Sequence, residues 1–177
     1  VKKTSPKLNV QPVTGGTGTM MKRIEAESQN PRGDLFWSGG VGTLGAYRQH
    51  LQAYRPADLD KIPAEFRGPD DLWVGTNVHV MVMMVNERQL KGLPAPATWS
   101  DLMQPQWKNK FAITDPSKSG TAYMLVYGLY KQFGQAGLDK IAANAVVTAS
   151  SGTTYKGVAA GEYAVGMTLE YAAQEYV

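Results

Sequence analysis

Apolar and polar residues follow two spacings along the chain, and the two spacings succeed one another in a regular order. Residues 8–13 alternate apolar and polar, as a half-buried strand does, and residues 20–27 carry apolar positions at helical spacing. A glycine-rich turn separates them. The same succession is predicted once more, with a short strand at 34–37 and a helix at 41–51.

The clearest strand comes next in the middle of the chain. Residues 78–85 are almost continuously apolar, which predicts a strand covered on both faces, as in a parallel sheet. Before it, residues 55–71 are rich in Pro and Asp and predict a surface loop. The later elements are a short helix with its N-cap at Thr98, a strand at 111–114, helices at 121–133 and 138–143, a strand at 146–148, a helix at 155–160 and a strand at 163–169. Strands that alternate with helices predict an α/β fold with largely parallel sheets.

Four turns of similar composition each follow a predicted strand and open a predicted helix. They lie at residues 14–18, 38–40, 117–121 and 150–153. Glycine allows close approach of a ligand, the free N–H groups of a helix N-terminus attract anions, and Ser or Thr hydroxyls add donors. In open α/β sheets such turns meet at the carboxyl edge of the strands, where ligands bind. A Ser or Thr is also the usual way to begin any helix, so one such turn alone carries little weight. We expect the ligand to contact Thr14, Gly16, Thr17, Ser38, Gly39, Ser119, Gly120, Thr121, Ser151, Gly152 and Thr153.

Composition narrows the classes of function. The formal charge is +3, and the Lys and Arg residues are scattered, which argues against a nucleic-acid surface. No apolar run approaches the ~20 residues of a membrane helix, so we expect a chain that does not span a bilayer. The absence of cysteine removes disulfides and thiolate ligands. Residues 1–6 lack the apolar segment of a secretory signal, so we expect a signal peptide to be absent from this chain.

One motif points to an enzyme. Residues Gly40–Gly45 match the G-x-G-x-x-G dinucleotide fingerprint, and an NAD(P)-dependent α/β enzyme is therefore an alternative hypothesis. The context does not fit, because residues 55–58 form a loop where a second strand ending in an acidic residue is required. His79 lies in the predicted strand and has no further metal ligands at suitable spacing, so we interpret it as a core or hinge histidine. We expect no catalysis, no cofactor and no metal.

Six stretches together resemble the family 1 bacterial extracellular solute-binding proteins, in the branch of ferric-ion, phosphonate and sugar-phosphate binders. The stretches are residues 13–18, 31–40, 61–66, 96–102, 110–122 and 156–166. The resemblance implies a two-lobed periplasmic-binding-protein fold of type II, with lobe one and a crossing strand in residues 1–84 and lobe two in 85–177. It also implies a periplasmic location, a small ligand held in the cleft between the lobes, and the membrane permease of an ABC importer as partner.

The same resemblance bears on the ligand. It places Glu170 and Tyr171 where ferric-ion binders have tyrosine ligands, but those proteins carry adjacent tyrosines and here Ala172 follows. Fe(III) prefers anionic oxygen ligands, whereas Ser/Thr-Gly turns suit phosphate, phosphonate or carboxylate oxygens. We therefore expect a small organic anion, a phosphonate or sugar phosphate, and keep Fe(III) as the alternative within the family.

The resemblance also implies that lobe one is incomplete. Family members begin with a further strand and helix and return to lobe one after a segment such as residues 163–177. We therefore expect lobe one to leave a sheet edge and apolar faces uncovered. A third hypothesis follows, in which the chain binds no small ligand and buries that edge in a dimer.

Overall fold

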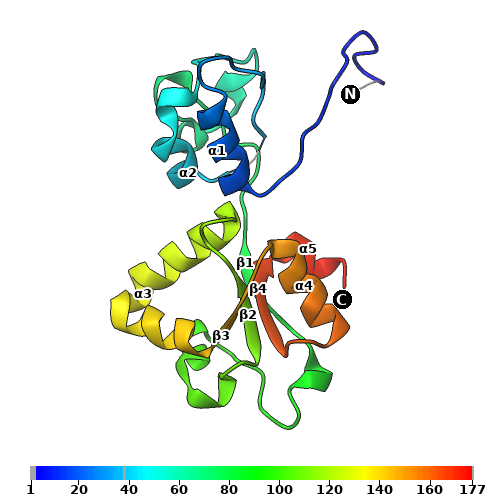
Figure 1. The fold of residues 1–177 in the computed structure, drawn as a ribbon, viewed down its shortest axis with the longest axis vertical. Coiled ribbons are helices and arrows are strands. Elements are labelled where there is room, and N and C mark those ends of the chain that lie inside the picture. Colours follow the sequence, from blue (N-terminus) through cyan, green and yellow to red (C-terminus); the bar gives the residue numbers. More distant parts are fainter. Residues whose placement is uncertain (1–2, 38, 177) are drawn as a thin grey trace.

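The computed structural model describes residues 3–37 and 39–176, which form two parts (Figure 1). The N-terminal part, residues 3–37 and 39–80, consists of helices and turns. The C-terminal part, residues 81–176, is built around a sheet, and the chain enters it through the segment that leads into the first strand.

The sheet has four strands in the order β1-β4-β2-β3. They are β1 (Met81–Val85), β2 (Phe111–Thr114), β3 (Ala145–Thr148) and β4 (Val165–Leu169). β2 is parallel to both β3 and β4, whereas β1 is antiparallel to β4. The parallel arrangement predicted from the sequence is therefore confirmed for three strands and wrong for β1. The difference arises because the chain enters the sheet at the edge where the other strands end, with Met81 opposite Leu169.

β1 is shorter and less covered than the apolar run predicts. It begins at Met81, and Met84 is its only buried residue, while Val78 and Val80 before it are exposed. The prediction of a strand covered on both faces is wrong because β1 is the outermost strand of the sheet. A continuous apolar run does not distinguish an edge position from a central one.

Helices cover both faces of the sheet (Figure 1). α3 (Gly120–Asn144) lies on one face, and α4 (Ser151–Ala160) with α5 (Glu170–Gln174) lies on the other. α3 unites the two predicted helices of residues 121–133 and 138–143, and Gly134, with φ of 65°, marks the break between them. The larger apolar cluster joins α3 to the sheet and includes Leu102, Trp107, Phe111, Leu125, Leu129, Ile141, Val165 and Met167.

Short 3-10 helices lie between β1 and β2 in the chain. They are η5 (Glu87–Gln89), η6 (Trp99–Met103) and η7 (Pro105–Trp107). The predicted N-cap at Thr98 is confirmed, since Thr98 and Asp101 form a capping box at the start of η6. The buried Asn144 at the end of α3 donates to the carbonyl oxygens of Leu102 and Gln104, each at 3.0 Å. This amide therefore joins the end of α3 to η6.

The N-terminal part contains α1 (Thr17–Ala26) and α2 (Val41–Ala46), followed by η1 (Arg48–His50), η2 (Leu59–Lys61), η3 (Ala64–Phe66) and η4 (Pro69–Asp71). The strands predicted at 8–13 and 34–37 do not form, and the helix predicted at 41–51 divides into α2 and η1. The apolar side chains of the two strand predictions are exposed, at Leu8, Val10, Val13, Leu35 and Trp37. A strand requires a hydrogen-bonding neighbour, and no described residue provides one for either segment. An alternating pattern alone cannot provide that neighbour.

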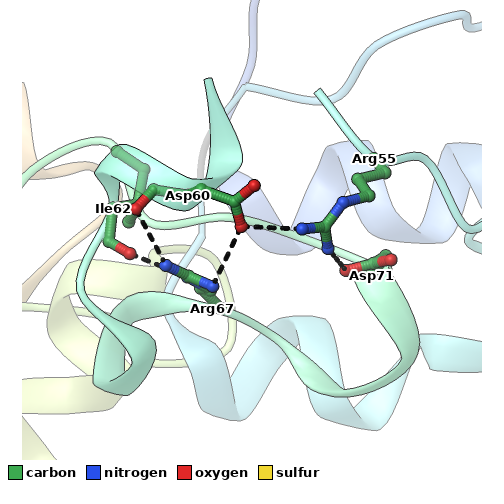
Figure 2. A network of polar contacts seen from close by, with 5 residues as sticks. All are labelled: Arg55, Asp60, Ile62, Arg67 and Asp71. Atoms are coloured by element: carbon green, nitrogen blue, oxygen red, sulfur yellow. Dashed lines mark hydrogen bonds and ion pairs between the residues drawn. The ribbon is translucent and has the colours of Figure 1, made fainter. Parts of the chain in front are cut away.

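An ion-pair network organises the loop between η1 and β1 (Figure 2). Asp60 contacts the guanidinium groups of Arg55, at 2.7 Å, and Arg67, at 3.7 Å. Arg67 also donates from Nε to the carbonyl oxygen of Ile62 at 2.7 Å, which closes the end of η2. These ion pairs are largely exposed, so each contributes little to the free energy of unfolding. The bond from the half-buried Arg67 to the backbone is therefore expected to contribute more to the shape of this loop.

Candidate functional site

Two turns of the C-terminal part lie next to each other at the carboxyl edge of the sheet. β2 and β3 are parallel, so residues 115–119 and 149–150, which follow them, leave the sheet on the same side. The backbone N–H of Asp115 donates to the carbonyl oxygen of Thr148 at 2.9 Å, so the strand pairing continues into the turns. The turn chemistry predicted from residues 117–121 and 150–153 is thus brought to one place.

The Asp115 carboxylate holds the first of these turns. It accepts hydrogen bonds from the Ser117 hydroxyl at 2.7 Å and the Ser117 backbone N–H at 2.9 Å, and Lys118 lies at 3.3 Å. These bonds lower the pKa of Asp115 below its ordinary value, with the Ser117 hydroxyl as the largest cause. The carboxylate is therefore occupied in turn formation rather than directed at a ligand.

Serine hydroxyls cap both helices that begin at these turns. Ser119 Oγ accepts from the N–H of Ala122 at 3.3 Å at the start of α3. Ser150 Oγ accepts from the N–H of Thr153 at 3.1 Å at the start of α4. The hydroxyls of Ser119 and Ser151 lie 2.9 Å apart. The first turns of the two helices, with their free N–H groups, therefore face the same space.

The first turn of α1 lies against the turn that opens α3. A Cβ added at Gly16 would lie 2.5 Å from the carbonyl oxygen of Lys118, and one at Gly120 would lie 3.1 Å from Thr17 Oγ1. Gly18 would make an equally close contact with Ser117. Glycine is required here for close approach of one backbone to another, as well as for any approach of a ligand. Thr14, at the start of the first turn, is exposed.

A pocket of about 200 Å³ lies between the two parts at this contact. Its lining consists of Thr17, Gly18, Gly42, Thr43, Ala46, Tyr47, Pro116, Ser117, Ser119, Gly120 and Tyr123. No formally charged side chain is among these lining residues. The sequence prediction of Thr17, Ser119 and Gly120 agrees with this lining, but Tyr47 and Tyr123 were missed. Tyr123 lies in α3 and Tyr47 at the turn between α2 and η1, and in the sequence neither aromatic residue gives a signal that distinguishes a pocket wall from surface.

The described residues of the predicted turn at 38–40 do not line the pocket. Ser38 lies outside the described residues. Gly39 adopts φ of 85°, and a Cβ there would lie 3.6 Å from the Thr17 side chain. Gly42 and Thr43 of α2 line the pocket in its place.

The dinucleotide hypothesis is not supported by this geometry. Gly40–Gly45 covers the N-cap and most of the six-residue helix α2, and no strand forms at 34–37 before it. A Rossmann site requires a strand, a tight turn and then a helix. The described sheet also has four strands, one of them antiparallel, rather than the continuous six that this hypothesis predicts.

The remaining predicted residues of the later turns do not line the pocket. Thr121, Gly152 and Thr153 stand in the first turns of α3 and α4. Glu170 and Tyr171 begin α5 and are exposed, and the Tyr171 ring lies 6.2 Å from that of His79. His79 precedes β1 and is exposed, so the interpretation as a core histidine is wrong because the strand begins two residues later.

The described residues contain neither a metal-binding cluster nor a membrane-spanning helix. Within residues 3–37 and 39–176, no three His, Asp or Glu side chains gather as a metal would require. No helix in the described part of the chain is long and apolar enough to cross a membrane.

The comparisons with known proteins agree with this architecture. A family model described as "Bacterial extracellular solute-binding protein" matches residues 34–176. A periplasmic protein of Salmonella typhimurium, named for 2-aminoethylphosphonate binding, is 31% identical over 151 residues, which are 81% of this chain and 43% of that protein. Iron uptake protein A2 of Synechocystis is 29% identical over 102 residues, which are 55% of this chain and 29% of that protein. The chain thus spans less than half the length of these relatives.

A solved structure gives the same result. The periplasmic binding protein AfuA from Actinobacillus pleuropneumoniae, with exogenous fructose-6-phosphate bound, superposes with a TM-score of 0.79 at 27% identity. The match covers 98% of this chain and 60% of AfuA. The predicted two-lobed α/β fold of type II is therefore confirmed.

Proposed function

The chain belongs to the bacterial extracellular solute-binding proteins, and on that premise we propose that it is the periplasmic binding component of an ABC importer. In this proposal it holds a small organic anion in the pocket between its two parts, which act as lobe one and lobe two; the boundary lies before β1, whose five residues all pair with β4, rather than at residue 84. A membrane permease receives the ligand. The protein binds and releases its ligand unchanged and carries out no reaction.

The observation that carries the proposal is the meeting of helix N-termini at one pocket. α1 has ten residues and α3 has 25, so both are long enough to present a dipole end to the lining. α4, also of ten residues, does not line the pocket but begins beside it, next to Ser119. Ser119 and Ser151 add hydroxyls 2.9 Å apart between two of them. An anion in this space would accept hydrogen bonds from fixed N–H groups and would meet no acidic side chain of the lining.

The chemistry of the lining favours a phosphate or phosphonate group over iron. Hydroxyls and N–H groups donate to anionic oxygens, whereas Fe(III) requires anionic oxygen donors. Tyr47 and Tyr123 in the same lining offer apolar ring faces with a phenol at the tip, suited to the organic body of a ligand. The relatives named for 2-aminoethylphosphonate and solved with fructose-6-phosphate fit this ligand class.

Fe(III) is a second candidate because Tyr171 and His79 lie together at the end of β4, with their rings 6.2 Å apart. A relative named for iron uptake supports the same ligand. Tyr171 and His79 alone are a poor ligand set for a trivalent cation. Ala172 stands where a second tyrosine would be, and it is buried and offers no ligand atom.

Binding in such a site works by closure of two parts over the ligand. The contacts of Gly16 and Gly18 with the turn of residues 115–119 bring α1 directly onto α3. A ligand that contacts α1 on one side and α3 and α4 on the other stabilises this closed arrangement, which the permease recognises.

Isothermal titration calorimetry tests the proposal. The panel is 2-aminoethylphosphonate, fructose 6-phosphate, inorganic phosphate and Fe(III) supplied as citrate. We expect heat from at least one phosphorus compound and none from iron. Binding of Fe(III) with no response to the other three would overturn the ligand class, and native mass spectrometry of the purified protein identifies any ligand that copurifies.

A further inference from the structure

Three threonine side chains meet where β2 and β3 end and α4 begins. Thr114 ends β2, Thr148 ends β3 and Thr154 lies in the first turn of α4. Their exposed fractions are 3%, 5% and 0%. Thr154 Oγ1 lies 2.8 Å from Thr114 Oγ1 and 2.6 Å from Thr148 Oγ1. We call these three residues the threonine triad.

The triad forms a continuous chain of hydrogen bonds. In one arrangement that uses every proton, Thr114 donates to Thr154, Thr154 donates to Thr148, and Thr148 donates to the carbonyl oxygen of Ile113 at 3.3 Å. Hydroxyl chains of this kind reinforce one another in a buried environment. Because a buried hydroxyl without a partner is unfavourable, removal of the central one affects both neighbours.

The triad connects the turn of residues 115–119, which lines the pocket, to the neighbouring turn of residues 150–153, which does not. Thr114 directly precedes Asp115, whose carboxylate holds the turn of residues 115–119. Thr148 and Thr154 lie on either side of Ser150, and the Thr148 hydroxyl can donate to the carbonyl oxygen of Ser150, at 3.3 Å, in place of that of Ile113. The triad is therefore positioned to hold both turns in one arrangement, in which the hydroxyls of Ser119 and Ser151 lie 2.9 Å apart.

We propose that Thr154 is a positioning residue for the ligand site, which couples the turn of residues 115–119 to the turn of residues 150–153 through the threonine triad. Thr154 is fully buried and does not touch the ligand. The expected effect of Thr154 on ligand affinity rests on the proposed function. The coupling of the two turns does not, because it is a property of the ligand-free protein.

Thr154→Val tests the coupling because it keeps the shape of the side chain and removes the hydroxyl. Thr154→Ser restores the hydroxyl, and Thr168→Val makes the same chemical change at an equally buried threonine of β4 outside the triad. Hydrogen–deuterium exchange of the ligand-free protein measures peptides covering residues 114–122 and 148–156. Calorimetry with 2-aminoethylphosphonate measures affinity.

We expect both peptides to exchange faster together in Thr154→Val, with affinity lower by roughly tenfold. Thr154→Ser and Thr168→Val should behave like the wild type in both measurements. Faster exchange confined to residues 148–156, or a serine variant that behaves like valine, would overturn the coupling. If the wild type does not bind the phosphonate, the ligand assignment fails and the exchange result alone decides the coupling. Should Thr154→Val not fold, Thr114→Val removes the other end of the chain and is judged by the same two peptides.

Discussion

The hydroxyl oxygens of Ser119 and Ser151 lie 2.9 Å apart, although 32 positions separate the two residues in the sequence. Each stands in or beside the first turn of a helix, Ser119 as the N-cap of α3 and Ser151 as the first residue of α4. The contact therefore brings two helix N-termini together beside the pocket that Ser119 lines.

Ser119→Ala should weaken both the fold and the site. It removes the hydroxyl that caps α3, which lowers the free energy of unfolding by about 1 kcal/mol, and it removes a donor from the pocket. Calorimetry should show affinity for the bound anion lower by roughly tenfold. Ser119→Thr keeps the hydroxyl and serves as the matched control. An alanine variant with unchanged affinity would remove this residue from the site.

Gly16→Ala should hinder closure of the two parts. The new Cβ would lie 2.5 Å from the carbonyl oxygen of Lys118, so α1 and the turn of residues 115–119 must move apart. Small-angle X-ray scattering should show that the radius of gyration no longer decreases when ligand is added. Gly33→Ala is the control, because a Cβ there meets nothing within 4 Å. Normal ligand-induced compaction of the Gly16 variant would contradict a tight contact in the closed form.

Tyr171→Phe separates the two ligand candidates. The phenol of Tyr171 does not line the pocket, so we expect the affinity for a phosphonate or sugar phosphate to stay within about twofold of the wild type. Absorption spectroscopy after addition of Fe(III) citrate checks the alternative, since tyrosinate bound to Fe(III) gives a visible charge-transfer band. The appearance of that band in the wild type, and its loss in the phenylalanine variant, would support iron instead.

Acid should destabilise the protein in a defined pH range. Backbone N–H groups of Thr98 and Ala97 lower the pKa of Asp101, and Ser117 lowers that of Asp115, each from an ordinary value of 3.8. A carboxyl group with a lower pKa in the folded protein contributes stability above its ordinary pKa, and that contribution is lost as the pH falls through the folded value. Urea unfolding midpoints should therefore be insensitive to these two groups above about pH 5 and fall below about pH 4.

Asp101→Asn provides the check on that pH dependence. The variant keeps a side-chain oxygen as acceptor but cannot ionise, so its midpoint should fall less steeply with acid than that of the wild type. A parallel loss in both proteins would show that other groups cause the acid sensitivity.

Arg67→Ala should loosen the loop between η1 and β1. The variant loses the bond from Nε to the carbonyl oxygen of Ile62, and the free energy of unfolding should decrease by about 1–3 kcal/mol. Asp60→Asn alters only exposed ion pairs and should change it by less than about 1 kcal/mol. Equal effects of the two variants would show that the ion pairs, rather than the bond to the backbone, hold the loop.

The sequence predicted the C-terminal part more accurately than the N-terminal part, for a physical reason. Strands β2, β3 and β4 pair with one another within the chain, so local pattern and tertiary contacts agree. In residues 8–13 the pattern is equally clear, but no described residue pairs with it. Hydrophobic periodicity indicates which face a segment would bury, and the partner decides whether it does so.

The ligand contacts stay a prediction, but the lining of the pocket was predicted in part. Ser119, Gly120 and Thr17 could be selected because turn chemistry is visible in consecutive residues. Tyr47, at the turn after α2, and Tyr123, in α3, are far apart in the sequence, and their approach depends on tertiary packing. The threonine triad was missed for the same reason, since its members are 34 and six positions apart and each alone is an ordinary buried threonine.

The pairing between β2 and β4 has a mechanical consequence. These strands share only the pairs Phe111–Val165 and Ala112–Gly166, whereas β1 and β4 are paired over their full length. A displacement of β1 passes to β4 and reaches the turns after β2 and β3 through this short pairing and through the two helices that pack across it, α3 on one face and α4, which contacts Gly166, on the other. The sheet thus consists of two well-paired halves, β1 with β4 and β2 with β3, joined by a short pairing. We therefore expect relative sliding of β2 and β4, rather than bending of any one strand, to limit how much a displacement of one half moves the other.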